Sequence, residues 1–380
     1  MGRIITTLDQ ILRAKVRLLE NPPRMGARVE GGYLHWQVGR YREKLFRVGP
    51  GGVGRKQIWV PEFEAEQHNL VLNQAYDSLI PQHGLVPLNR YAAVGTGSTA
   101  PAPTQTGLVN EVARTGTVPG GESDQVLYIS PGVYDIRRVK EFTEAQVGGR
   151  NLTEWGFSPV SSAGNNLMCR ELFRDGNGNP VVLTLDADQR LRLIYTLRIT
   201  LTPVTPQAVT VNIAGVGTRT GQFMLTGHLS TRTDTGGFIT IDHGGIAFNS
   251  FSEGDRRGDL LALSVFAAGS RLGYTPDLFL SSNAAPLTYL HTTEMLGGNA
   301  APNFKQLSYL PPSGRSRSAY VLVANTEWVF TFRSICLRAT TSNYHYYTPT
   351  INLVLDFGQE FTKDNLNKLL IGNWVLTWGP

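Results

Sequence analysis

At 380 residues, the chain is long enough for about two domains with a buried core. Hydrophobic residues make up 41% of it and charged residues only 17%, while 41 glycines and 21 prolines favour turns and strands over helices. We expect no membrane span and no secretory signal, because no apolar stretch approaches about 20 residues. Cys169 and Cys336 lie far apart in apolar runs. They predict buried thiols, which excludes a disulfide framework.

The positive charge is concentrated near the N-terminus. The net charge is +5, but residues 1–59 hold 12 Lys or Arg and 4 Asp or Glu, a local excess of +8. Apolar side chains on one stripe predict an amphipathic helix over 7–20. We expect residues 1–60 to be a basic docking region for an acidic partner surface, with a solvated arm as the alternative. The candidate docking residues are Leu8, Ile11, Leu12, Arg13, Arg17, Arg24 and Arg28.

Two further elements are expected before residue 90. Alternating residues predict a small β region over 31–60, with a turn or loop at Gly49-Pro50-Gly51-Gly52. A second, short helix is predicted over 69–80, because its apolar residues share one face, and Pro81 is expected to end it.

The segment 91–103 has the spacing of a dinucleotide-binding motif without its structural context. A predicted strand over 91–94 leads into small residues that satisfy G-x-G-x-x-A. In that motif a helix N-terminus holds the pyrophosphate. Here two prolines follow, and they disfavour a helix. We therefore interpret the segment as a structural turn, expect no nucleotide cofactor there, and assign the turn to Gly95, Gly97, Pro101 and Pro103.

From residue 125 onward the pattern is one of short strands. Residues 191–201 alternate with period two, and 209–213, 222–228 and 260–266 continue the strand pattern. The spacing predicts a mainly β fold of antiparallel β-sandwich domains, with two such domains in tandem as one arrangement. The predicted boundaries are 61–203 for the first domain and 204–380 for the second, which contains a long loop over 274–318.

Polar clusters suggest little chemistry. Asp175, Asn177, Asn179 and Asp186 occupy positions 1, 3, 5 and 12 of a calcium-loop template, but proline replaces the glycine at position 6. A hairpin turn is the preferred interpretation. The seven histidines are scattered, without metal-ligand spacing.

A second acidic cluster consists of Glu253, Asp255 and Asp259. Paired carboxylates could serve glycoside hydrolysis. The interleaved Arg256 and Arg257 instead favour a solvated, salt-bridged loop. We therefore predict a protein that is not an enzyme and that carries no cofactor or metal.

Several segments together resemble structural proteins of tailed-bacteriophage virions. The matching segments are Asn69-Leu70-Val71-Leu72-Asn73, then the turn from Tyr91 to Pro101, then Asn151-Leu152-Thr153-Glu154-Trp155-Gly156-Phe157, and the C-terminal segment from Asn373 to Pro380. The similarity covers roughly residues 68–203 and is looser beyond them. Tail, tail-fibre and related appendage proteins are the family that the chain resembles.

The resemblance implies an oligomeric, mostly β subunit of a virion, assembled in the host cytoplasm and associated with the tail. Its partners would be copies of itself and other virion proteins, and we do not expect nucleic acid among them. A head decoration or head-fibre protein is one alternative. A module that binds a host-surface receptor or polysaccharide is another, with Tyr344, Tyr346 and Tyr347 as a stacking platform and strand packing as their alternative role.

Overall fold

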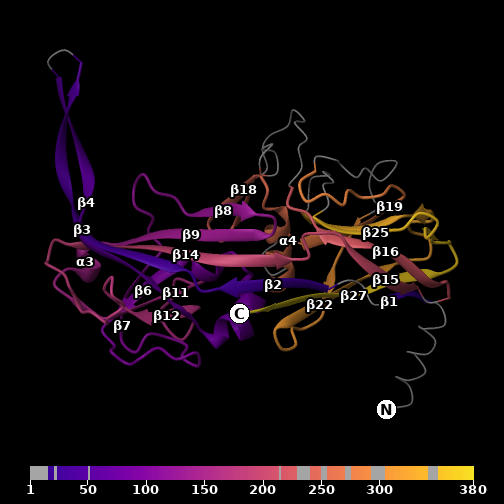
Figure 1. Cartoon of the computed structure of the whole chain (residues 1–380), viewed down its shortest axis with the longest axis horizontal. Helices are drawn as coiled ribbons and strands as arrows, with labels where there is room; N and C mark the ends of the chain where they lie inside the picture. The colour runs from indigo at the N-terminus through magenta and orange to yellow at the C-terminus, as the bar shows by residue number, and fades with distance from the viewer. Residues whose placement is uncertain are drawn as a thin grey trace.

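The computed structural model describes residues 16–20, 24–49, 52–213, 215–228, 240–249, 255–269, 275–291, 304–340 and 350–380. The molecule is an elongated β-rich body from one end of which a hairpin projects (Figure 1). The prediction of a mainly β fold is confirmed.

Sixteen strands form one branched sheet that contains segments from the whole length of the chain. Its strands are β1 (Val16–Glu20), β2 (Arg24–Glu30), β3 (Tyr33–Val48), β4 (Gly52–His68), β8 (Gln125–Ser130), β9 (Val133–Phe142), β14 (Arg190–Thr202), β15 (Gln207–Ile213), β16 (Gly217–Leu225), β19 (Thr275–Ser281), β20 (Phe304–Gln306), β21 (Ser308–Tyr309), β22 (Ser316–Val323), β24 (Ser334–Thr340), β25 (Ile351–Leu355) and β27 (Lys368–Gly379).

The remaining strands form smaller sheets. A five-stranded sheet has the order β5-β12-β11-β6-β7, and the two-stranded sheets are β10-β13, β17-β18 and β23-β26. Their bounds are β5 (Leu70–Val71), β6 (Tyr91–Gly95), β7 (Glu111–Thr115), β10 (Asn151–Leu152), β11 (Glu154–Ser158), β12 (Cys169–Leu172), β13 (Leu183–Thr184), β17 (Thr240–His243), β18 (Ile246–Asn249), β23 (Thr331–Phe332) and β26 (Phe361–Thr362).

Strand β14 is the centre of the first half, as its alternating sequence predicts. One edge pairs with β9, and the other pairs first with β3 and then with β2. Every second side chain from Leu191 to Leu201 is buried. That buried face meets the five-stranded sheet, where Tyr195 stacks on Phe157 with 4.6 Å between ring centroids and Trp155 lies 5.9 Å away. Two sheet layers therefore enclose the core here.

Strand β27 joins the two halves. It runs parallel to both β1 and β2 and antiparallel to β22, and β2 also pairs antiparallel with β14. The expectation of a purely antiparallel arrangement is thus wrong at these two pairs. The parallel pairs unite strands from opposite ends of the chain, an arrangement that no short-range pattern encodes.

The N-terminal helix predicted over 7–20 is wrong for its last turn. Residues 7–15 lie outside the described residues, but Val16–Glu20 is strand β1 between β27 and β15. Five residues are too few for helical and strand periodicity to be separated when Leu18 and Leu19 are adjacent. Pairing on both edges decides in favour of the strand.

The second predicted helix is shifted toward the C-terminus. Strand β5 occupies 70–71, and the helical segment consists of the π-helix η1 (Ala75–Leu79) and α2 (Ile80–His83), followed by the 3₁₀ helix η2 (Pro87–Asn89). Pro81 does not end the segment but lies in the first turn of α2, where its missing N–H is tolerated. A short helix α3 (Glu144–Val147) begins with a capping box at Thr143 and Gln146.

The apolar run 260–266, predicted as a strand, is instead part of the helix α4 (Gly258–Ala268). All eleven residues of α4 are buried, so its sequence shows no amphipathic period. Gly269 adopts the left-handed conformation that ends helices, with φ of 66°. Likewise, the stretch 274–318 is not one long loop, because it contains β19, β20, β21 and the start of β22.

Candidate functional site

The most unusual surface feature is the outer part of the β3–β4 hairpin. Strand β14 pairs with β3 only as far as Gly39, whereas β3 and β4 remain paired with each other out to Val48 and Gly52. Residues 40–60 therefore form a two-stranded arm that projects from the body (Figure 1); Pro50 and Gly51 at its turn lie outside the described residues. At roughly 3.3 Å per residue the arm is about 30 Å long.

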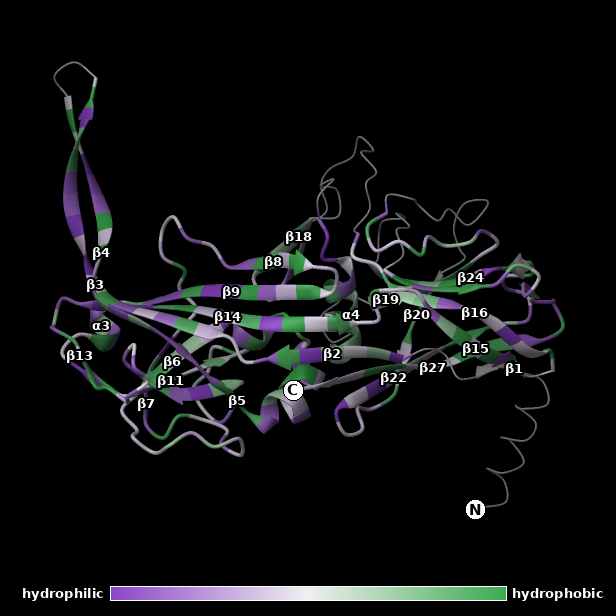
Figure 2. Ribbon diagram, in the orientation of Figure 1, coloured by the Kyte–Doolittle hydropathy of each residue, from purple (hydrophilic) through white to green (hydrophobic). Residues whose placement is uncertain are grey.

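The arm has neither a core nor a charge balance of its own. It contains six Lys or Arg and one Asp or Glu, and polar and apolar residues alternate along it (Figure 2). Lys44 lies directly opposite Lys56, an arrangement that repels. Isolated two-stranded hairpins are marginally stable in water. The arm's sequence is thus unfavourable for a free arm and suited to one that contacts an acidic surface.

One face of the arm combines apolar and cationic side chains. Leu45 lies opposite Arg55, and Arg47 opposite Val53, so that strand alternation brings all four to the same face. Leu45 is 60% exposed and Val53 is 68% exposed. We call these four residues the tip face. On the other face the Phe46 ring covers Gly54, where a Cβ would lie 2.5 Å from it.

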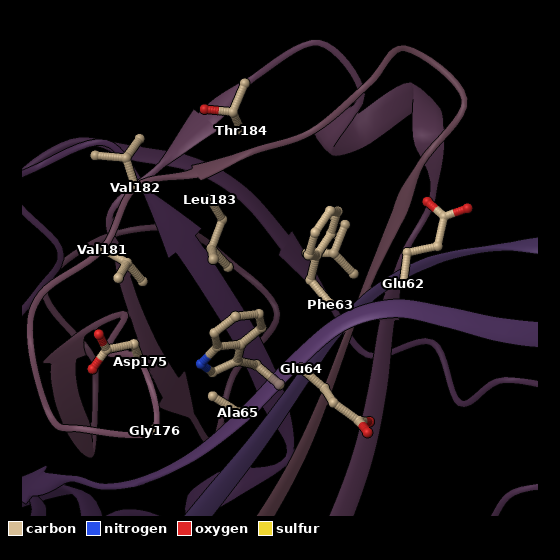
Figure 3. A pocket seen from close by; sticks show the side chains of 12 residues that line it. Glu62, Phe63, Glu64, Ala65, Asp175, Gly176, Val181, Val182, Leu183 and Thr184 are labelled. Carbon is tan, nitrogen blue, oxygen red and sulfur yellow. The ribbon is translucent and has the colours of Figure 1, made fainter.

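A groove of about 570 Å³ lies at the base of the arm. Figure 3 shows Phe63 and Leu183 in its apolar interior and the carboxylates of Glu62 and Glu64 pointing away from it. Phe63 is 63% exposed and Val182 is 57% exposed, so the apolar floor is open to solvent. The twelve lining residues include three carboxylates and no Lys or Arg: Trp36, Val38, Glu62, Phe63, Glu64, Ala65, Asp175, Gly176, Val181, Val182, Leu183 and Thr184.

The acidic edge of the groove extends beyond its lining. Arg40 contacts Glu62, Asp186 and Asp188, with N–O distances of 2.8, 3.2 and 2.6 Å. Hydrogen bonds from Arg40, Gln189 and Arg42 hold the pKa of Glu62 down to about 2, so this carboxylate stays charged. Two arginines face three carboxylates here, and the edge keeps a negative excess.

The Gly95–Gly97 turn binds a carboxylate of its own chain. Glu154 Oε1 accepts hydrogen bonds from the backbone N–H of Gly97 and of Asn110, both at 2.9 Å, and Oε2 accepts one from Val109 at 3.1 Å. Arg170 donates to the same carboxylate at 2.8 Å, and both side chains are fully buried. The chain then runs from β6 to β7 without a helix, which confirms that prediction.

The buried pair also fixes the proline-containing loop. Arg170 donates to the carbonyl of Thr99 and to Gln105, at 2.8 and 2.7 Å. The Pro103 carbonyl accepts from Asn73 at 2.8 Å, and Pro101 lies in the same loop. Neither Glu154 nor Arg170 stands out in the sequence, since each belongs to an ordinary strand pattern.

Replacing Gly97 with alanine should lower the free energy of unfolding by about 1–3 kcal/mol, because overpacking forces the neighbours to move. A Cβ there would lie 2.5 Å from Glu154 Oε1 and 2.4 Å from Val109 Cβ. Chemical denaturation measures the change. Gly120→Ala is the control, since nothing lies within 4 Å of its Cβ position. Equal stability of the two variants would contradict the account.

The second acidic cluster contains a buried network that the sequence does not indicate. Asp259, predicted to lie in a solvated loop, is fully buried in α4 and accepts from Tyr134 and Tyr289 at 2.5 and 2.8 Å. Burial raises the pKa of Asp259 to about 6. Asp255 does pair with Arg257, at 2.5 Å; Glu253 lies outside the described residues.

Most of the predicted docking residues are outside the described part of the chain or within the sheet. Arg17 is in β1, and Arg24 and Arg28 are exposed on β2, where Arg28 contacts Glu30 at 3.3 Å. The remaining candidates for docking and for glycan stacking lie outside the described residues: Leu8, Ile11, Leu12, Arg13, Tyr344, Tyr346 and Tyr347.

The other sequence-based candidates are structural. Asp175 accepts from the backbone N–H of Asn177 and Asn179, both at 2.9 Å, in a turn closed by the Arg174–Pro180 bridge. The predicted hairpin turn is thereby confirmed. Cys169 and Cys336 are buried free thiols, as expected, and burial raises the pKa of Cys169 to about 12.

Within the described ranges, no group of three or more His, Cys, Asp or Glu side chains is arranged to hold a metal ion. In the same part of the chain, no helix combines the length and the apolar character needed to cross a membrane. Comparison of the chain with protein-family models, with curated proteins and with solved structures found no match.

Proposed function

We propose that this chain is a structural subunit of a tailed-bacteriophage particle, associated with the tail, that acts by subunit assembly rather than by catalysis. The observation that carries the proposal is the arm of residues 40–60. It projects from the body, exposes apolar side chains and carries five more basic than acidic residues. A surface of this kind is stabilised by burial against another protein.

The architecture supports the same role. The β14 region, built as a sandwich-like pair of layers, provides a rigid base on which the arm is held by the β3–β14 pairing. The resemblance of residues 68–203 to phage virion proteins supplies the kind of assembly. Copies of this chain and other virion proteins are the proposed partners, and the virion is the proposed location.

The experiment uses particles purified from cells that produce the virus encoding this chain. We expect antibodies against the chain to label the tails in electron micrographs. A variant with residues 42–58 replaced by Asn-Gly should fold, because the removed residues pair only with one another, yet should be absent from particles. Purified particles that lack the native chain would refute the proposal, and labelled heads would refute the tail position.

A further inference from the structure

Given the proposed role in assembly, we infer that the tip face of one copy docks into the acidic-edged groove at the base of the arm of a second copy. The tip face has two exposed apolar side chains between two guanidinium groups. The groove has an apolar floor between carboxylates and contains no Lys or Arg in its lining. The two surfaces are therefore complementary in both polarity and charge.

Geometry requires that the two surfaces come from different copies. The groove is lined by Trp36, Val38, Phe63 and Ala65, which belong to the base of the same hairpin. The tip face lies several residues further out along continuously paired strands, on the order of 20 Å away at roughly 3.3 Å per residue. The paired strands would have to separate for a tip to reach its own groove.

The charges of the arm favour this occupant. Docking would place Arg47 and Arg55 near Glu64 and Asp175, and would bring the repelling Lys44 and Lys56 close to the acidic edge formed with Asp186 and Asp188. Leu45 and Val53 would cover the exposed Phe63 and Val182. Salt should weaken the contact, because its charged groups lie at the margin of the interface.

The contact is heterologous, since the two surfaces differ, so each docked copy still presents one free tip face and one free groove. Such a contact propagates into a ring when the rotation closes and into a helical stack when it does not. Both products are repeating structures built from one contact.

The test combines two variants with opposite defects. Leu45→Asp together with Val53→Asp removes the tip face but leaves the groove, and Val182→Asp removes the groove but leaves the tip face. All three positions are exposed, so both variants should fold. Leu366→Asp is the matched control, because Leu366 is 81% exposed and lies on neither surface.

Light scattering after size exclusion, in low salt, gives the result. We expect the native chain and the Leu366 variant to form oligomers, each interface variant to be monomeric, and an equimolar mixture of the two to form a 1:1 complex through its one intact tip face and one intact groove. A native chain that stays monomeric at its highest soluble concentration, or a mixture without a complex, would overturn the inference.

A further measurement separates this inference from the proposed function. If the arm is needed for incorporation into particles but the mixture forms no complex, the arm contacts a different virion protein: the inference fails and the proposed function stands. If the tip variant instead loses retention on immobilised duplex DNA that the native chain shows, the arm is a nucleic-acid contact, which also overturns the inference.

Discussion

Replacing Arg170 with methionine should lower the free energy of unfolding by about 3–5 kcal/mol, the range found when one partner of a buried ion pair is removed. Arg170 and Glu154 are both fully buried, and methionine fills similar space without charge. The Glu154 carboxylate would keep its three backbone donors but lose its counter-charge in a medium of low polarity. The loop through Thr99 and Gln105 would lose its anchor at the same time.

Chemical denaturation of the purified chain measures the loss, provided that the slope with denaturant is unchanged. Arg174→Met is the matched control. Arg174 also pairs with a glutamate, Glu171, at 3.1 Å, but its side chain is 31% exposed, so we expect a change of less than about 1 kcal/mol. A cost for Arg170→Met no greater than that of the control would show that the buried pair does not stabilise the turn.

Acid should destabilise the protein through His243, by about 3 kcal/mol between pH 6.5 and pH 4. Burial, helped by the charge of Arg138, lowers the pKa of this histidine from 6.5 to about 4. Its Nε2 lies 2.6 Å from Ser264 Oγ, which already accepts from the N–H groups of Leu85 and Val86. The hydroxyl proton of Ser264 is thus donated to Nε2, and a neutral imidazole is required.

The sign follows from proton binding. The folded state binds fewer protons than the unfolded state between about pH 6.5 and pH 4, so this contribution is fully present above pH 6.5 and is lost as the pH falls toward 4. The raised pKa of Asp259, about 6, acts in the opposite direction, because protonation of that carboxyl favours the folded state. The native curve alone therefore does not isolate His243.

His243→Gln supplies the comparison, because its amide oxygen can accept the Ser264 proton but does not titrate. The measurement is the difference in unfolding free energy between the native chain and this variant at a series of pH values. We expect the difference to change by about 3 kcal/mol across the window, in favour of the variant at low pH. A difference that is constant with pH would show that His243 remains protonated in the fold.

The arm was only half visible in the sequence. Alternation over 31–60 predicts strands and the glycine-rich turn predicts a hairpin, and both are confirmed. Strands usually run for about 5–6 residues, so two strands of 16 and 17 residues are themselves a signal of something beyond a compact domain. The pairing of β3 with β14 stops at Gly39, and this decides where the body ends and the arm begins.

Local patterns determined those features that depend on neighbours in sequence. The period-two alternation of 191–201 fixes both the strand and its buried face, because strand geometry sends alternate side chains to opposite sides. Pro101 and Pro103 exclude a helix after Gly97, because they restrict the backbone wherever they lie in a fold. Composition determined the β class for the same reason.

Only the tertiary structure decided features that depend on distant partners. Val16–Glu20 becomes a strand because β27 and β15 lie on its two edges, and α4 is a helix whose complete burial hides its period. The groove joins residues 36–65 to 175–184, and the glycine turn waits for Glu154 from β11. Intrinsic preferences are worth only a fraction of a kcal/mol per residue, so long-range packing and burial outweigh them at such positions.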